Sequence, residues 1–252
     1  MSLVEPLAGE YVVIPARYAS SRFPGKPLAP IRGVPLILRV HERVLSVFPN
    51  DRILIATDDH RIRDACESRG ARVRMTPSSC LTGTDRVWEA VRDMEVSVIL
   101  NVQGDEPLIC AEDLVTVLME KRKNSGQVVN AMCRISDPAE IESPHVPKVV
   151  VNERSELVYM SRAAVPYPKS SGVDLSRLYR RQVCIYGFRG DELKRFSEFG
   201  RKSGLEAPED IEILRFLDLG IPVRMVEVRS GSVAVDVPED VCRVERLMAS
   251  AS

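Results

Sequence analysis

The chain has 252 residues, of which 44% are hydrophobic, and its 35 Lys and Arg nearly balance its 36 Asp and Glu, for a formal net charge of -1. This length suffices for one large α/β domain. The balanced charge provides no broad basic field, which argues against nucleic-acid binding. No apolar stretch approaches the roughly 20 residues of a membrane helix, and we expect no export signal.

Six cysteines are scattered along the chain, and no two of them form a CxxC pair. Such cysteines are typical of buried, reduced thiols, so we expect a cytoplasmic protein without disulfides. The three histidines are not closely paired, which makes a zinc site improbable.

The first half of the chain alternates between two hydrophobic periods. Short apolar runs predict strands at 11–16, 52–57, 71–75 and 97–102. Apolar residues at helical spacing predict helices at 36–47, 59–69, 82–94 and 111–123. This alternation is typical of βαβ units and a parallel sheet, whose ligands bind where the strands end.

The pattern changes after residue 127. Short strands are expected at 128–135, 148–152, 156–160 and 184–189. The segment 162–178 is rich in Pro, Ser and Gly and reads as an irregular excursion. A helix at 208–220, a strand at 223–228 and a helix at 238–250 follow. We predict one α/β domain over 1–252, with a mostly parallel central sheet and an inserted strand-rich lobe at roughly 130–190.

The loop after the first strand carries three cations within ten residues, Arg17, Arg22 and Lys26. Each can donate a charge-assisted hydrogen bond to a phosphate oxygen, and Gly25 would let the backbone approach a polyphosphate closely. The Ser20 hydroxyl is a further donor. The Walker pattern GxxxxGK[ST] is absent. On charge alone, a solvated basic loop is the simpler explanation.

The same segment, IPARYASSRFPGKP at 14–27, resembles the opening of the 3-deoxy-manno-octulosonate (Kdo) cytidylyltransferases, whose pattern is IPARxxSxRxPGKPL. Sialic acid activators instead read IPARxGSKxxxxKN. Further blocks resemble the Kdo family in the same order: ATDD (56–59), TGTDR (82–86), NVQGDEP (101–107), YMSRAAVPY (159–167), IYGFR (185–189) and VAVDVPED (233–240).

The resemblance implies a Rossmann-like nucleotidyltransferase fold whose inserted lobe forms a homodimer. It implies transfer of CMP from CTP to the anomeric hydroxyl of a 3-deoxy-2-ulosonic sugar acid, with release of pyrophosphate. The protein would be a cytoplasmic enzyme of lipopolysaccharide biosynthesis. Its partners would be CTP and a small sugar acid, with no nucleic acid and no membrane.

The resemblance also assigns residues to the nucleotide. Those implied to contact it are Pro15, Ala16, Arg17, Ser20, Arg22, Lys26, Thr57, Asp58, Gly83, Thr84, Gln103 and Asp105. The implied catalytic residues are Arg17, Arg22 and Lys26, whose charges would stabilise the leaving pyrophosphate, and Asp105, which would hold Mg²⁺. Gln103 offers both donors and acceptors to the cytosine edge or the ribose. Helix capping by Thr82 would by itself explain the TGTD segment.

Two aspartates are candidates for metal binding. Asp105 follows a fully apolar strand, and Asp236 lies in the VAVDVPED block. Carboxylates at the edge of a sheet can hold Mg²⁺, which bridges to substrate phosphates. With the resemblance we expect Mg²⁺ on both; without it, each would be more simply a turn residue or a helix cap.

The implied residues for the sugar acid are Gln103, Arg162, Gln182, Tyr186, Glu209 and Glu212. Arg162 could pair with a carboxylate through two hydrogen bonds. The two glutamates could bind sugar hydroxyls, although the exposed face of an amphipathic helix explains them equally well. Strand alternation places Tyr186 and Phe188 on one face of the sheet, and Ile185 on the other.

The acceptor side departs from the family pattern HxGxYxYR. Gln182 stands where the family has histidine, and Cys184 where it has glycine. The nucleotide motifs are intact, so the hypothesis is an acceptor that is Kdo or a modified Kdo-like acid, for example one with an amino group. A sialic-acid-type acceptor and a catalytically silent nucleotide-binding protein are the alternatives.

Overall fold

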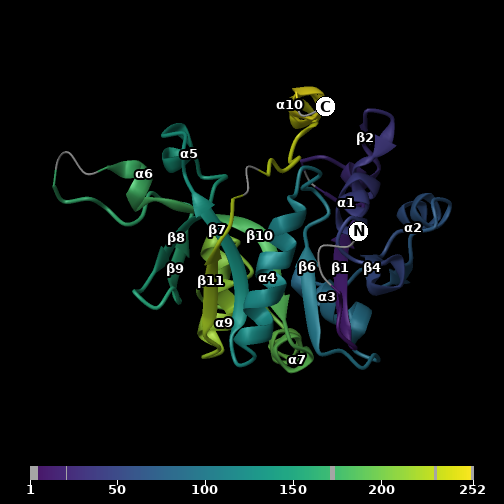
Figure 1. The fold of residues 1–252 in the computed structure, drawn as a ribbon, viewed down its shortest axis with the longest axis horizontal. Coiled ribbons are helices and arrows are strands. Elements are labelled where there is room, and N and C mark those ends of the chain that lie inside the picture. The colour runs from purple at the N-terminus through teal and green to yellow at the C-terminus, as the bar shows by residue number, and fades with distance from the viewer. Residues whose placement is uncertain (1–4, 21, 171–173, 230–231, 251–252) are drawn as a thin grey trace.

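A computed structural model describes residues 5–20, 22–170, 174–229 and 232–250. Its centre is a sheet with the strand order β11-β7-β10-β6-β1-β4-β5 (Figure 1). These strands are β1 (Glu10–Ala16), β4 (Ile53–Thr57), β5 (Val73–Met75), β6 (Val98–Val102), β7 (Val128–Arg134), β10 (Arg180–Phe188) and β11 (Val223–Glu227). Within the described chain, no helix has the length and apolar character needed to cross a membrane.

The sheet is mostly parallel, as predicted. β1 pairs in parallel with β4 on one side and with β6 on the other, and β5 continues the parallel array beyond β4. β10 runs antiparallel to both β6 and β7, while β11 is parallel to β7. The carboxyl ends of β1, β4 and β6 therefore lie along one edge of the sheet.

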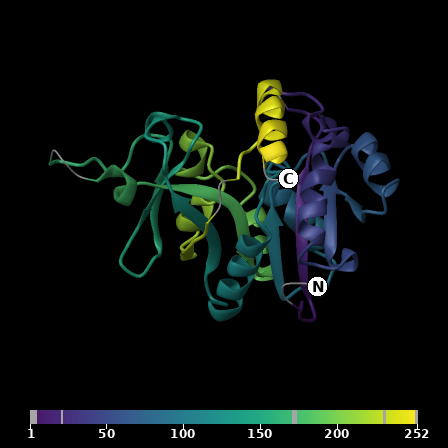
Figure 2. The same ribbon diagram turned by 45° about the horizontal axis from the view of Figure 1, so that its top comes forward.

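Helices cover both faces of the sheet (Figures 1 and 2). Apolar side chains of α1 (Leu36–Leu45), α2 (His60–Glu67) and α4 (Ala111–Lys123) pack against one face. Those of α3 (Gly83–Val91), α7 (Gly190–Glu198) and α9 (Leu214–Asp218) pack against the other. Burial on both faces explains why β1 and β6 are apolar runs without alternation.

A lobe extends from the β7–β10 side of the sheet (Figure 2). It contains α5 (Ala139–Glu142), β8 (Lys148–Val151), β9 (Leu157–Ser161) and α6 (Leu175–Leu178). β8 pairs with β9 and touches β10 at one position. Because β7 and β10 belong to the central sheet, the extension is narrower than the expected 130–190. Subunit pairing through it stays a prediction.

The small β2–β3 hairpin (Pro30–Ile31 and Val34–Pro35) contacts helix α10 (Pro238–Ser250). Val244 of α10 and Val235 pack with Ile31 and Leu36 in a separate small core. The first half of the chain also contains two short 3₁₀ helices, η1 (Lys26–Leu28) and η2 (Asn50–Arg52).

The prediction of one helix over 208–220 was wrong. The segment forms two short helices, α8 (Glu206–Glu209) and α9, separated by Asp210 in a left-handed conformation with φ of 52°. The break turns Glu209 toward the lobe and Glu212 toward α3. The backbone carbonyls of Glu209 and Asp210, which a continuous helix would pair with later amides, accept from the Arg162 guanidinium instead.

β10 begins four residues earlier than expected and contains a bulge between Val183 and Tyr186. The side-chain amide of buried Asn130 donates to the carbonyls of Val183 and Ile185, at 3.0 and 2.9 Å, and so satisfies the backbone that the bulge leaves unpaired. Beyond the bulge, Tyr186 faces one core and Ile185 the other, as the alternation predicts.

The loop after β6 passes so close to β1 that only glycine fits at position 104. A Cβ atom there would lie 2.8 Å from the carbonyl oxygen of Pro15 and 2.9 Å from Cδ1 of Ile37. We expect Gly104→Ala to lower the free energy of unfolding by about 1–3 kcal/mol, because the backbone must shift. Urea unfolding measures the change.

Gly126→Ala is the matched control, because a Cβ atom at Gly126 would meet no atom within 4 Å. Its effect should stay within about 1 kcal/mol and can be stabilising, since alanine restricts the unfolded chain. Equal unfolding midpoints for both variants would contradict the close approach of the loop after β6 to β1.

Candidate active site

A cavity of about 680 Å³ opens where β1 and β6 end. Its lining contains most of the residues predicted from sequence: Pro15, Ala16, Arg17, Ser20, Arg22, Lys26, Gly83, Gln103, Asp105, Arg162, Glu209, Glu212 and Asp236. Segments from both halves of the chain thus meet at one place, as ligand binding at strand ends would require.

Lys26 is the centre of a cluster of opposite charges in this cavity. Its Nζ lies 2.7 Å from Oδ2 of Asp105 and 3.4 Å from Oδ1 of Asp236. Nη2 of Arg22 lies 3.2 Å from the same oxygen of Asp236. The amide of Val235 donates to the carbonyl oxygen of Asp105 at 2.9 Å, which fixes the two acidic segments side by side.

The loop conformation presents Lys26 to the acids. Gly25 adopts a left-handed conformation with φ of 73°, and its amide donates to the carbonyl oxygen of Tyr18. The Tyr18 ring fills the space where a Cβ of Gly25 would lie, at 3.1 Å. The glycine of the PGKP segment therefore makes the turn after which η1 begins with Lys26.

Arg17 lines the cavity and is exposed, and its guanidinium has no hydrogen bond or ion pair with any described residue. Other cations of the lining are already engaged: Arg86 with Asp58 at 3.0 Å, and Lys202 with Asp210. Arg17 is thus the cation best able to bind an added anion without breaking a contact within the protein.

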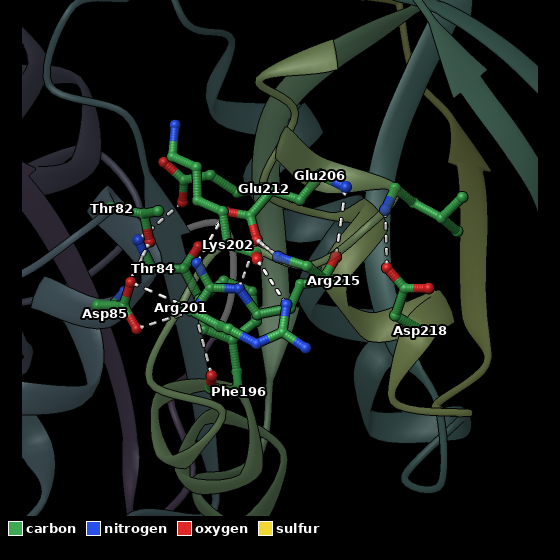
Figure 3. Close-up of polar contacts among 12 residues, drawn as sticks. Thr82, Thr84, Asp85, Phe196, Arg201, Lys202, Glu206, Glu212, Arg215 and Asp218 are labelled. Atoms are coloured by element: carbon green, nitrogen blue, oxygen red, sulfur yellow. Dashed lines mark hydrogen bonds and ion pairs between the residues drawn. The ribbon is translucent and has the colours of Figure 1, made fainter. Parts of the chain in front are cut away.

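Glu212 contacts the beginning of α3 (Figure 3). The amides of Gly83 and Thr84 donate to its two carboxylate oxygens at 3.0 and 2.8 Å. Burial raises the pKa of Glu212, and these hydrogen bonds oppose that effect. The Gln103 amide lies beside it, since a Cβ at Gly83 would be 3.3 Å from Nε2 of Gln103 and 3.4 Å from Oε1 of Glu212.

Arg162 and Glu209 form a connected pair on the lobe side of the cavity. The carboxylate of Glu209 accepts from the Arg162 amide at 2.8 Å, from the Ser161 hydroxyl at 2.7 Å and from the Tyr159 hydroxyl at 3.3 Å. The Arg162 guanidinium donates to the carbonyl oxygens of Pro144, Glu209 and Asp210. Both side chains hold the cavity wall in place, and neither has its charge free.

Five predicted residues lie outside the lining. Asp58 pairs with Arg86, which does line the cavity, and the Thr57 hydroxyl accepts from the amide of Asp59. Thr84 meets Glu212 through its backbone. The remaining two, Gln182 and Tyr186, lie behind the cavity.

Gln182 and Tyr186 are 9% and 6% exposed. Nε2 of Gln182 donates to Oδ1 of Asn130 at 3.0 Å and to the Tyr186 hydroxyl at 3.2 Å. The two residues therefore support the bulge of β10. Gln182, which departs from the family pattern, thus lies within the sheet and is not among the residues that line the cavity.

Several lining residues were not predicted: Pro27, Cys80, Leu81, Thr82, Arg86, Gly104, Pro144, His145, Lys202, Pro208 and Asp210. Four of these residues, Cys80, Leu81, Thr82 and Arg86, lie in or just before the TGTDR block at 82–86, so a wider reading of that block would have found them. His145 and Lys202 come from loops that carry no motif, and no sequence signal identified them.

The cytidylyltransferase family model matches residues 11–222. The chain is 39% identical over 238 residues to the 3-deoxy-manno-octulosonate cytidylyltransferase of Escherichia coli, covering 94% of this chain and 95% of that protein. The chain belongs to the 3-deoxy-manno-octulosonate cytidylyltransferase family. The resemblance of the sequence motifs is confirmed, and the protein is a nucleotidyltransferase.

Two further comparisons point to the same family, and a third shows the same fold. The mitochondrial 3-deoxy-manno-octulosonate cytidylyltransferase of Arabidopsis thaliana is 39% identical, covering 94% of this chain and 82% of that one. A structure of CMP:2-keto-3-deoxy-manno-octonic acid synthetase complexed with CTP has a TM-score of 0.87 at 37% identity, covering 97% and 100%. A 4-diphosphocytidyl-2C-methyl-D-erythritol synthase from Anaerococcus prevotii, at 14% identity and a TM-score of 0.63, shares the fold.

The hydrogen bonds of Glu209 predict a pH-dependent stability. Burial alone would raise the pKa of Glu209, but the Arg162 amide and the two hydroxyls lower it below its usual 4.5. The charged form therefore stabilises the fold above pH 4.5, and this contribution disappears as the pH falls through the lowered pKa. We expect Glu209→Gln to be less stable than wild type at pH 7, with a difference that shrinks in acid.

Urea unfolding at pH 7 and pH 4 measures this difference. The control is Glu198→Gln on α7, whose side chain is 62% exposed and should show little effect at either pH. A stability loss in Glu209→Gln that grows toward pH 4 would refute the assignment.

Proposed function

We propose that this protein transfers CMP from CTP to the anomeric hydroxyl of a 3-deoxy-2-ulosonic acid, and that the acid is Kdo. The observation that carries the proposal is the single cavity in which Arg17 and Lys26, Gln103, and the acidic pair Asp105 and Asp236 lie together. The relatives of this protein are named for the same cytidylyl transfer to 3-deoxy-manno-octulosonate.

The cations of the first loop would bind the triphosphate. Arg17 is free to take a phosphate oxygen, and Lys26 and Arg22 lie beside it in the lining. As the anomeric oxygen attacks the α-phosphorus, negative charge accumulates on the departing pyrophosphate. Fixed cations at that position stabilise the transition state more than the ground state, without a covalent intermediate.

Asp105 and Asp236 fit a divalent metal ion, which we propose to be Mg²⁺. Their carboxylates already share one cation, the ammonium of Lys26. In the described parts of the chain, no group of three or more His, Cys, Asp or Glu could hold a metal. That suits Mg²⁺, which takes one or two carboxylates and completes its shell with water and substrate phosphates. Bound there, it would polarise the phosphates and lower the pKa of the attacking hydroxyl.

The wall formed by Arg162, Glu209 and Lys202 would receive the sugar acid. Gln103 lies between this wall and the first loop and has both donors and acceptors for either substrate. Because Gln182 lies behind the lining, its replacement of the family histidine gives no direct contact with which to select a modified acid. This placement removes the reason to expect an amino-modified acid, and the names of the relatives favour Kdo over a sialic-acid-type acceptor.

We also propose a cytoplasmic homodimer formed through the lobe. All six cysteines are free thiols, which suits a reducing compartment. Val158 on β9 and Tyr167 beyond it are 55% and 88% exposed, so two large side chains of the lobe are accessible to a partner subunit.

The test is pyrophosphate release from CTP and Mg²⁺ with Kdo, an amino-modified Kdo and N-acetylneuraminate as separate acceptors. We expect Kdo to give the highest kcat/KM. Lys26→Ala should lower kcat by roughly 10²-fold or more, because it removes a cation from the leaving group. The control Lys194→Ala removes an exposed lysine of α7 and should match wild type.

Higher kcat/KM with either alternative acid would refute the choice of Kdo. Release with none of the three acids would refute the transfer itself, and near-normal turnover by Lys26→Ala would refute the role of that lysine.

A further inference from the structure

Two walls of the cavity are tied together by polar side chains behind its lining. α3 begins at the nucleotide side with Gly83, and the segment with α8 and α9 forms the acceptor side with Glu209 and Glu212. Figure 3 shows the side chains between them converging on Arg215. Arg215 itself is not among the residues that line the cavity.

Arg215 joins carboxylates from both walls. Its Nε and Nη2 donate to the two oxygens of Glu206 at 2.6 and 2.7 Å, and its Nη1 donates to Oδ1 of Asp85 at 3.2 Å (Figure 3). Nη1 also donates to the carbonyl oxygen of Phe196, whose ring lies 3.7 Å below the guanidinium. Glu206 belongs to α8, and Asp85 to α3, so one cation bridges the two sides.

The cluster is fully enclosed by protein. Arg215 is 0% exposed and Glu206 1%, and Asp85 is 6% exposed. Burial raises the pKa of Asp85, while hydrogen bonds from Thr82 and the charge of Arg215 oppose that effect. One cation faces two carboxylates, which is a poor arrangement for stability alone, because desolvation offsets much of the attraction. Its directional bonds, however, fix the distance and angle between α3 and α8 in a way that apolar packing would not.

Glu212 provides a second tie close by. Its carboxylate binds the first amides of α3, while the preceding turn holds the Arg162 backbone through Glu209. The acceptor side therefore meets the nucleotide side at the cavity lining through Glu212, and behind the lining through Arg215.

We propose that Arg215 is a positioning residue for the transfer reaction. It sets the acceptor-side segment relative to α3, and thereby the distance from the anomeric oxygen to the α-phosphorus. A displacement of about 1 Å between reacting groups can lower a rate by roughly 10²-fold. The inference rests on the proposed function, since it concerns the geometry of that reaction.

The test variant is Arg215→Met, which keeps much of the side-chain length and removes the charge. Lys121→Met is the matched control: Lys121 is also 0% exposed, its Nζ lies 2.7 Å from Oε1 of Glu192, and the pair joins α4 to α7 away from the cavity lining. Arg215→Met leaves two buried carboxylates, Glu206 and Asp85, without their cation, and Lys121→Met leaves one, Glu192. Both variants should therefore melt roughly 10 °C or more below wild type.

Steady-state kinetics with CTP and Kdo then separate positioning from stability. In Arg215→Met we expect kcat to fall by roughly 10²-fold, with a KM for CTP within about threefold of wild type, because the triphosphate cations are elsewhere. In Lys121→Met, kcat should stay within about threefold of wild type. A similar kcat in the two variants would overturn the proposal, as would a loss in Arg215→Met confined to KM for CTP.

A milder variant covers the case in which Arg215→Met does not fold. Asp85→Asn leaves the Arg215–Glu206 pair intact and removes only the negative charge of Asp85. Its melting temperature should therefore stay near that of wild type. We expect kcat to fall by roughly tenfold, and an unchanged kcat would overturn the proposal. A wild-type protein that releases no pyrophosphate would contradict the transfer reaction itself, whereas failure of the positioning role alone leaves wild-type turnover intact.

Discussion

The ammonium group of Lys26 holds the two carboxylates of Asp105 and Asp236 together at the centre of the cavity. Without a cation between them the two acids would repel each other. Three segments far apart in the sequence meet through this contact: the loop after β1, the end of β6 and the segment before α10. The parallel sheet makes the meeting possible, because β1 and β6 end at the same edge. The close approach at Gly104 then brings the acidic loop against the basic one.

The second half of the chain forms the other wall of the cavity, and the charged groups of that wall are paired differently. Its charged side chains mostly bind to the protein itself: Glu209 to the Arg162 backbone, Arg162 to three carbonyl oxygens, and Glu212 to the first amides of α3. This wall is therefore held by internal hydrogen bonds, whereas the Arg17 guanidinium on the first wall bonds to none of the residues that the structure describes. A preformed wall facing a free cation suits a reaction that depends on placing two substrates.

The sequence was sufficient for those features that depend on local pattern. The helix at 111–123 has the predicted bounds, since its apolar spacing and its acidic and basic ends agree. The grouping of Lys26, Asp105 and Gln103 followed from strand ends in a parallel sheet together with the family motifs. The break at Asp210 was missed, because Pro208 and the acids around it also fit the first turn of a helix. The break is stabilised by hydrogen bonds to residues far away in the sequence, Arg162 in the lobe and Gly83 in α3. The sequence also placed Gln182 in the sugar-acid site, whereas its side chain points into the sheet toward Asn130. The bulge that Asn130 holds determines this direction, and no local pattern predicts it.

Asp105 and Asp236 need a cation between them, and in the proposed reaction a metal ion takes that place when the triphosphate binds Lys26. Calorimetric titration of CTP into the protein, with and without Mg²⁺, measures whether it does. CTP should bind several-fold more tightly with Mg²⁺, and Asp236→Asn should remove most of this difference. Equal affinity for CTP in the presence and absence of Mg²⁺ would show that the acidic pair holds no metal ion.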